Sequence, residues 1–148
     1  MTPFQPGDIV YCYSSETTPP KDKYHLILCC DATQNDYYYL GLLINHEIRK
    51  RYLGNPDALY CQLEVTSADG FPYLNKYPVS YIDCWFKSYT KQSEFDANFK
   101  DDSRYHKVGR LPKVFVNQVI TRLNAGKGEV FSPRDINIIA KSLLDAYS

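Results

Sequence analysis

Basic residues are grouped before and after a pair of apolar runs, residues 24–30 and 37–44. The basic residues on its two sides are Lys21, Lys23, Arg49, Lys50 and Arg51. Cations placed where strands leave a sheet can surround a phosphate group and neutralise its charge. We therefore expect these five side chains to contact phosphate. The simpler alternative for each is a solvated surface charge.

Three histidines are candidates for proton transfer, because imidazole changes charge near neutral pH. His46 stands at the end of the second apolar run, beside Glu47, which is the best position for a general acid or base. The alternative for His46 is a solvated loop residue. His25 lies inside an apolar run and is expected to be structural, and His106 falls in a solvated basic stretch.

The central stretch predicts an antiparallel hairpin that would position these side chains. Residues 24–30 and 37–44 are rich in β-branched and aromatic residues, and the polar residues 31–36 separate them. Because both runs are almost continuously apolar, we expect both strands in the middle of a sheet. Further strands are predicted over residues 9–13, 59–65 and 80–86, with a turn at residues 54–57.

The period of the apolar residues changes after residue 110, and two helices are predicted. The first spans residues 111–125, with Gly126 as its stop signal. The second begins at Ser132 as N-cap with Pro133 in the first helical position. Its buried stripe is expected to consist of Ile136, Ile139, Ala140 and Leu143. The elements together predict a mainly β, α+β fold: a small, curled antiparallel sheet with two C-terminal helices.

Composition limits the function further. The 148 residues suit one domain, and 17 basic against 17 acidic side chains give no net charge. This balance argues against a protein that coats nucleic acid non-specifically, although a local basic patch stays possible. The five cysteines form no CxxC pair, so buried free thiols in a reducing cytoplasm are expected. We see no signal peptide and no apolar run of the ~20 residues that a membrane helix needs.

Several short motifs resemble the PemK/MazF family of toxins. The motifs are PGDIV at 6–10, KYHLIL at 23–28, LLIN at 42–45, SYIDC at 80–84 and VGRL at 108–111. The similarity extends from about residue 6 to residue 123. It implies an SH3-like barrel in a single domain. By this comparison residues 1–86 form the barrel core, 87–110 an irregular excursion and 111–148 a helical C-terminal part.

The resemblance also implies an activity and its site. Active members of the family are metal-independent endoribonucleases that cut single-stranded RNA, need no cofactor, and are neutralised by a partner antitoxin. Lys23 stands at the position of the family's catalytic arginine, and Asn45 at that of its catalytic threonine or serine. His46 and Ser80 would assist, and a turn-capping role is the alternative for Ser80. A homodimer is implied by the same comparison.

Two departures from the family pattern keep other functions open. Lysine at position 23 lacks the planar fork that holds a phosphate with two hydrogen bonds. Asparagine at position 45 donates a hydrogen bond but has no hydroxyl group. A barrel that has lost catalysis and binds a protein partner is therefore an alternative, as is a toxin that poisons a protein target. Among Tyr37, Tyr38 and Tyr39, a ring could stack on a base, or all three could pack in the core.

Overall fold

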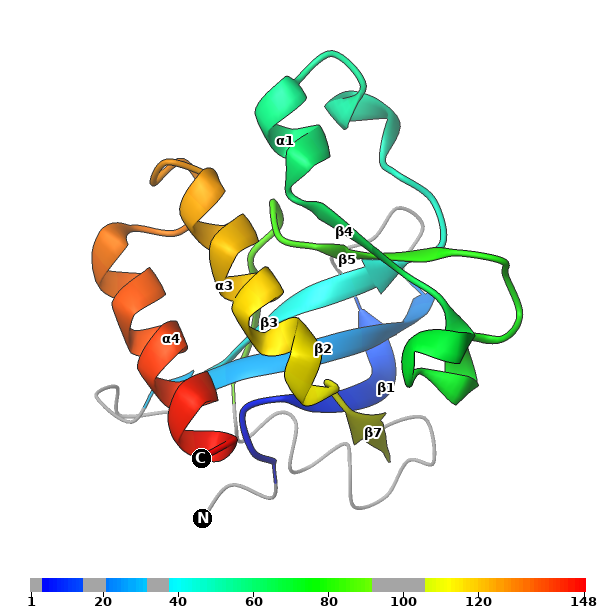
Figure 1. Cartoon of the computed structure of the whole chain (residues 1–148), viewed down its shortest axis with the longest axis horizontal. Helices are drawn as coiled ribbons and strands as arrows, with labels where there is room; N and C mark the ends of the chain where they lie inside the picture. The colour runs from blue at the N-terminus through cyan, green and yellow to red at the C-terminus, as the bar shows by residue number, and fades with distance from the viewer. Residues whose placement is uncertain (1–3, 15–20, 32–37, 92–105) are drawn as a thin grey trace.

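The predicted hairpin forms the middle of the sheet (Figure 1). A computed structural model describes residues 4–14, 21–31, 38–91 and 106–148 of the chain. Strands β2 (Lys21–Asp31) and β3 (Tyr38–Asn45) pair antiparallel, with Leu26 opposite Leu42 and Tyr24 opposite Ile44. A bulge between Ile27 and Cys29 shifts the register. Both strands have neighbours on each side, which confirms their predicted central position.

Five further strands complete the described sheet: β1 (Asp8–Ser14), β4 (Gln62–Val65), β5 (Ser80–Asp83), β6 (Ser88–Lys91) and β7 (His106–Arg110). The order across the sheet is β4-β5-β3-β2-β1-β7, and β6 pairs with another part of β3. Every pairing among them is antiparallel. The described residues therefore form a mainly antiparallel sheet with helices, as the α+β prediction states.

The strand predicted over residues 59–65 is wrong at its start. Helix α1 (Pro56–Tyr60) occupies the region, and only Gln62–Val65 is extended. The side chain of Asn55 accepts a hydrogen bond from the Ala58 amide, and Pro56 takes the first helical position. These two residues were interpreted as a turn, but together they make a helix N-terminus.

The irregular excursion predicted for residues 87–110 is wrong at both ends. Strand β6 begins at Ser88, and strand β7 ends at Arg110. Residues 92–105 between them lie outside the described part. Among the described strands β7 pairs with β1 alone, and its side chains are exposed or half-buried. Backbone pairing rather than apolar burial therefore defines β7, so its sequence carries no alternation that a pattern search can find.

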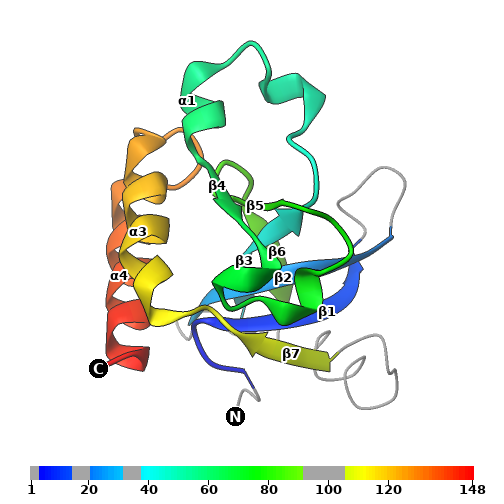
Figure 2. The ribbon, with the colours of Figure 1, turned by 45° about the vertical axis from the view of Figure 1, so that its right-hand side comes forward.

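The two predicted C-terminal helices pack side by side over one face of the sheet (Figure 2). Helix α3 (Val116–Ala125) follows a 3-10 helix over Lys113–Phe115 and ends at Gly126 as its C-cap. Helix α4 (Pro133–Ala146) begins at Ser132, whose hydroxyl accepts the Asp135 amide at 3.1 Å. Ile136, Ile139 and Leu143 are buried against the sheet as expected. Ala140 is only half-buried.

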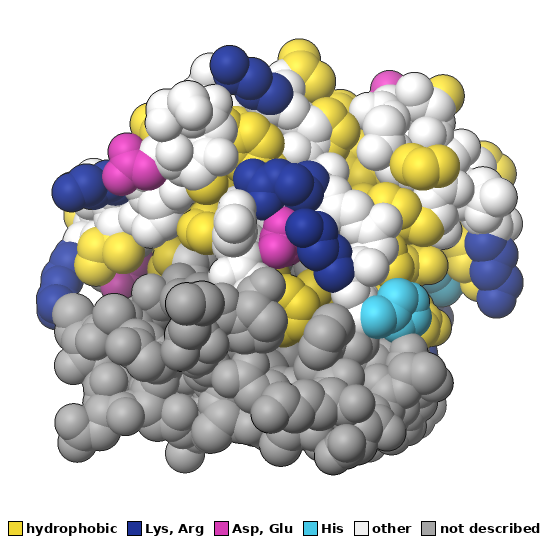
Figure 3. Space-filling model, turned by 90° about the horizontal axis from the view of Figure 1, so that it is seen from below, with side chains coloured by type: hydrophobic (Ala, Val, Ile, Leu, Met, Phe, Trp, Pro, Cys, Tyr) yellow, Lys and Arg dark blue, Asp and Glu magenta, His cyan; other side chains and the backbone are white. Residues whose placement is uncertain are grey.

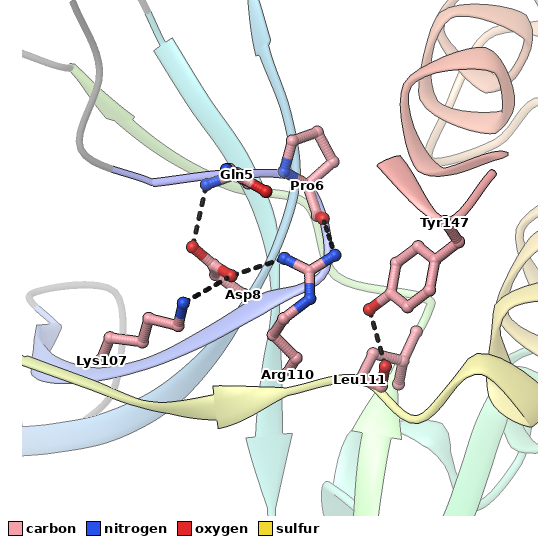
Figure 4. A network of polar contacts seen from close by, with 7 residues as sticks. All are labelled: Gln5, Pro6, Asp8, Lys107, Arg110, Leu111 and Tyr147. Carbon is pink, nitrogen blue, oxygen red and sulfur yellow. Dashed lines mark hydrogen bonds and ion pairs between the residues drawn. The ribbon is translucent and has the colours of Figure 1, made fainter. Parts of the chain in front are cut away.

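A polar network around Asp8 joins β1, β7 and α4 (Figure 4). The Asp8 carboxylate is 1% exposed and accepts the Arg110 guanidinium at 2.7 Å and the Gln5 amide at 2.9 Å. The Lys107 ammonium lies 3.4 Å from the same carboxylate. Arg110 also lies over the ring of Tyr147, whose hydroxyl donates to the Leu111 carbonyl at 2.6 Å. The start of the sheet is thereby fixed to the end of the last helix.

Two expectations from composition can be compared with the structure. Cys61 and Cys84 are buried free thiols, as expected. Within the described ranges no helix is long and apolar enough to cross a membrane.

Candidate functional site

The sheet brings Lys23, Asn45 and Ser80 to one end of three neighbouring strands. Tyr24 on β2 lies opposite Ile44 on β3, so Lys23 and Asn45 are next to each other in register. Asn45 in turn pairs with Tyr81 on β5, which places Ser80 one residue away. Strand pairing thus gathers residues that the chain separates by more than twenty positions.

A hollow of about 270 Å³ opens at this end of the sheet, and we call it the cationic hollow. Its lining includes Lys21, Lys23, Asn45, His46, Arg49 and Lys50. Four of these six side chains carry a positive charge, whereas Glu47 is the one acid among the lining residues. A concentration of cations of this kind attracts an anion.

A second hollow of about 250 Å³ adjoins the first, and we call it the tyrosine hollow. Its lining includes Tyr11, Tyr24, Tyr73, Lys76, Tyr77 and Ser80. Lys21, Lys23 and His46 line both hollows, so the two share a border. A ligand that spans this border would contact both the cations and the aromatic rings.

The expected site residues divide between the two hollows. Neighbouring residues of a strand point to opposite faces. Lys23 and Asn45 therefore leave the sheet on one face, and Ser80 on the other. Consistent with this, Asn45 lines only the cationic hollow and Ser80 only the tyrosine hollow. Lys23, at the end of the sheet, borders both.

Burial and neighbouring cations change the protonation of Lys23. Burial first, and then the charges of Lys21 and Arg49, lower the pKa of its ammonium group to about 8. The Asp83 carboxylate opposes this shift. A lysine with a pKa near neutral pH can stabilise an anion and can also exchange a proton with it.

Asn45 presents a hydrogen-bond donor with no partner. Its side chain is 7% exposed, and its Nδ2 atom makes no hydrogen bond among the described residues. A buried donor left unpaired costs about 1–3 kcal/mol. Asn45 lines the cationic hollow and is therefore a candidate hydrogen-bond donor to an anion held there.

Arg49 is oriented by a buried carboxylate. The Arg49 Nε atom lies 3.6 Å from Oδ2 of Asp83, which is fully buried at the end of β5. Tyr52 donates to the same carboxylate at 3.0 Å, and Gln62 at 2.8 Å. The guanidinium also lies 4.4 Å from the ring centre of Phe86. These contacts hold Arg49 in place at the rim of the hollow.

The remaining basic candidates differ in position. Lys50 is exposed and lines the cationic hollow. Arg51 lines neither hollow, because its guanidinium lies over the rings of Tyr52 and Phe86 at 5.5 and 5.6 Å. The prediction that Arg51 contacts a ligand phosphate has no geometric support.

The three histidines occupy different environments. His46 stacks on Tyr77 with ring centres 4.0 Å apart and planes 9° apart, at the border of the two hollows. His25 is buried in β2, where burial and then Lys23 lower its pKa to about 4. His25 is therefore neutral at physiological pH and structural, as expected. His106 is exposed at the start of β7, with its ring 6.0 Å from that of Tyr11.

The rings of the tyrosine hollow were missed at the sequence level. The tyrosines proposed for stacking were Tyr37, Tyr38 and Tyr39, and their side chains lie outside the described part. Tyr73 and Tyr77 belong to a loop with two 3-10 helices, where neither a period of two nor one of 3.6 applies. No pattern in the chain signals that this loop covers the end of β2.

Surface charge and comparison with known proteins add little to the geometry. Seen from below, basic and acidic side chains alternate with apolar ones over the described part of the surface (Figure 3). The described part of this face carries no extended basic field. No family model matches the chain, and a search of curated proteins finds no relative.

Proposed function

We propose that the chain is a PemK/MazF-like toxin, a metal-independent endoribonuclease that acts on single-stranded RNA. The proposal includes closure of the curled sheet into an SH3-like barrel. Its main support is the cationic hollow, where the unpaired Asn45 amide lies beside Lys23, Lys21 and Arg49. A phosphodiester would satisfy the amide and balance the cations at once.

The proposed reaction uses the 2′-hydroxyl of RNA as the nucleophile. Neutral His46 accepts the hydroxyl proton while the 2′-oxygen bonds to phosphorus. The bond from phosphorus to the 5′-oxygen breaks, and the Lys23 ammonium donates a proton to the leaving oxygen. The products are a 2′,3′-cyclic phosphate and a 5′-hydroxyl, and water returns the two protein groups to their starting protonation. Asn45 and Arg49 bind the non-bridging oxygens, where negative charge increases in the transition state.

The experiment is a cleavage assay with end-labelled single-stranded RNA and a chelator present. We expect RNA fragments with cyclic phosphate ends, and no cutting of a deoxy oligonucleotide of the same sequence. Lys23→Ala and His46→Ala should each lower the rate by about 10²- to 10⁴-fold. Intact RNA at high protein concentration, together with unimpaired growth of cells that express the protein, would contradict the proposal.

A second candidate is a binding module that has lost catalysis. Lys23 and Asn45 favour it, because neither reproduces the family's catalytic group at its position. The double substitution Lys23→Arg with Asn45→Thr separates the two functions. If only the double variant cuts RNA, the natural site is a decayed nuclease that acts by binding a protein target.

Several partners belong to the proposal. A toxin of this kind acts in the cytoplasm, forms a homodimer and is held inactive by an antitoxin protein. Co-expression with a short, acidic, helix-rich protein encoded beside it should restore growth. Sedimentation of the purified chain measures the dimer.

A further inference from the structure

The tyrosine hollow lies between two groups of aromatic rings. Tyr24 contacts Tyr11 with ring centres 4.6 Å apart and Tyr73 with centres 5.5 Å apart. The second group is the stacked pair of Tyr77 and His46. Both groups line the same hollow. A flat, apolar ligand can contact ring faces from both groups there.

Tyr77 is the most accessible of these rings. It is 39% exposed, and it belongs to a loop rather than to the core cluster of the sheet. Its apolar surface is kept in place by the parallel stack on His46 rather than by burial. The Lys76 ammonium lies over the Tyr77 ring, 5.6 Å from its centre, so a base that stacks on this ring also meets a cation.

Some residues that line this hollow also carry polar groups. The Tyr73 hydroxyl is buried and has no hydrogen-bond partner among the described residues. Ser80, which carries a hydroxyl group, also lines this hollow, and the residue is 4% exposed. Apolar faces with a few polar groups at the edge are typical of sites that bind a heterocyclic ring. The volume of about 250 Å³ is close to the lower end of ~300–1,000 Å³ for small-molecule sites, which suits one base rather than a larger ligand.

The tyrosine hollow lies next to the cationic hollow, and this position indicates the class of ligand. Lys21 and Lys23 border both hollows, so a phosphate held by them lies next to the aromatic rings. A nucleotide carries an anionic phosphate and a flat base, and a single sugar separates the two. We infer that the tyrosine hollow is a base-stacking subsite of the RNA site, in which Tyr77 provides the principal stacking surface. The inference rests on the proposed function for the placement of the phosphate.

The test measures binding without cleavage. The probes are fluorescent 2′-O-methyl oligonucleotides, which cannot form a cyclic phosphate, and an abasic ribose–phosphate chain of equal length. Tyr77→Ala should weaken binding of the base-bearing probe about tenfold to a hundredfold, because stacking contributes about 1–3 kcal/mol per base. It should leave binding of the abasic probe unchanged. Tyr77→Phe keeps the ring and should bind as the natural protein does.

Tyr60→Ala is the matched control. Tyr60 is 52% exposed on α1 and lines neither hollow, so its removal tests for a general effect of losing a surface tyrosine. Equal binding of the base-bearing probe by Tyr77→Ala and the natural protein would overturn the inference. So would an equal loss with both probes, or no binding of either probe by the natural protein.

The two proposals fail separately. If Tyr77→Ala cuts RNA with an unchanged KM, the base subsite is wrong and the nuclease proposal stands. If the natural protein binds bases through Tyr77 but cuts nothing, the nuclease proposal is wrong and the base subsite stands.

Discussion

Lys23 borders both hollows, and its ammonium group loses a proton at a lower pH than most lysines do. The cause is burial first and the nearby cations Lys21 and Arg49 second. Because the pKa is about 8, the side chain is mostly charged at neutral pH and mostly neutral one or two pH units higher. Binding of an anionic ligand to Lys23 should therefore change in mildly alkaline solution.

Binding of single-stranded RNA should weaken as the pH rises through about 8. The sign follows from the charge: below the pKa the ammonium attracts phosphate, and above it the amine does not. Lys23→Arg should bind with little pH dependence in this range, because arginine keeps its charge. Titration of a 2′-O-methyl oligonucleotide by fluorescence anisotropy measures both. An equally steep loss in Lys23→Arg would assign the titration to another group.

At the scale of residues, the sequence predicted the cationic side of the site better than the aromatic side. Lys21 and Lys23 were predicted from their position at a strand end, and Asn45 from the resemblance alone. Tyr77 was not found, because its place over β2 depends on how a loop folds back. Asp83 is fully buried in β5, and the hydrogen bond from Gln62 stabilises its carboxylate there.

Among the elements, the 3-10 helix η1 (Lys50–Tyr52) and strand β5 are joined through one carboxylate. Tyr52 is buried, and its hydroxyl donates to Asp83. Burial and the adjacent Asp83 charge raise the pKa of Tyr52 to about 12, so the hydroxyl stays protonated and keeps donating. This bond fixes the segment that carries Arg49 against the sheet.

Tyr52→Phe should lower the free energy of unfolding by about 1–3 kcal/mol, because it removes a donor from a buried carboxylate. Tyr60→Phe is the control: Tyr60 is half-exposed, and its change should stay within about 0.5 kcal/mol. Urea unfolding followed by tryptophan fluorescence compares the two. Equal midpoints would show that the carboxylate does not need the tyrosine.

The elements that the sequence identified closely are those with strong local signals. The hairpin and helix α4 were predicted closely, because apolar runs and the Ser132–Pro133 cap are local signals. Helix α1 was missed, because its five residues are too few to show a helical period. Strands β6 and β7 were missed, because they depend on pairing with strands far away in the chain.

At the scale of the whole molecule, the Asp8 network connects residues more than a hundred positions apart in the sequence. Arg110→Met should lower the free energy of unfolding by about 2–3 kcal/mol, because it leaves a buried carboxylate without its shortest charged hydrogen bond. Lys107→Met removes a half-exposed cation from the same carboxylate and should cost less than about 1 kcal/mol. Urea midpoints of the two variants test the difference. Similar losses in both would assign the stability to net charge rather than to the Arg110 bond.

The pairing of β1 with β7 also bears on how the chain folds. Asp8 and Arg110 meet across a chain segment of 102 residues, so the contact closes a very long loop. Loop closure of this kind slows folding relative to local pairing. Until β7 arrives, one edge of β1 is open to other strands, including those of neighbouring molecules. Slow synthesis at low temperature should therefore improve the yield of native protein. The reason is that fewer partly folded chains associate with one another before β7 pairs with β1.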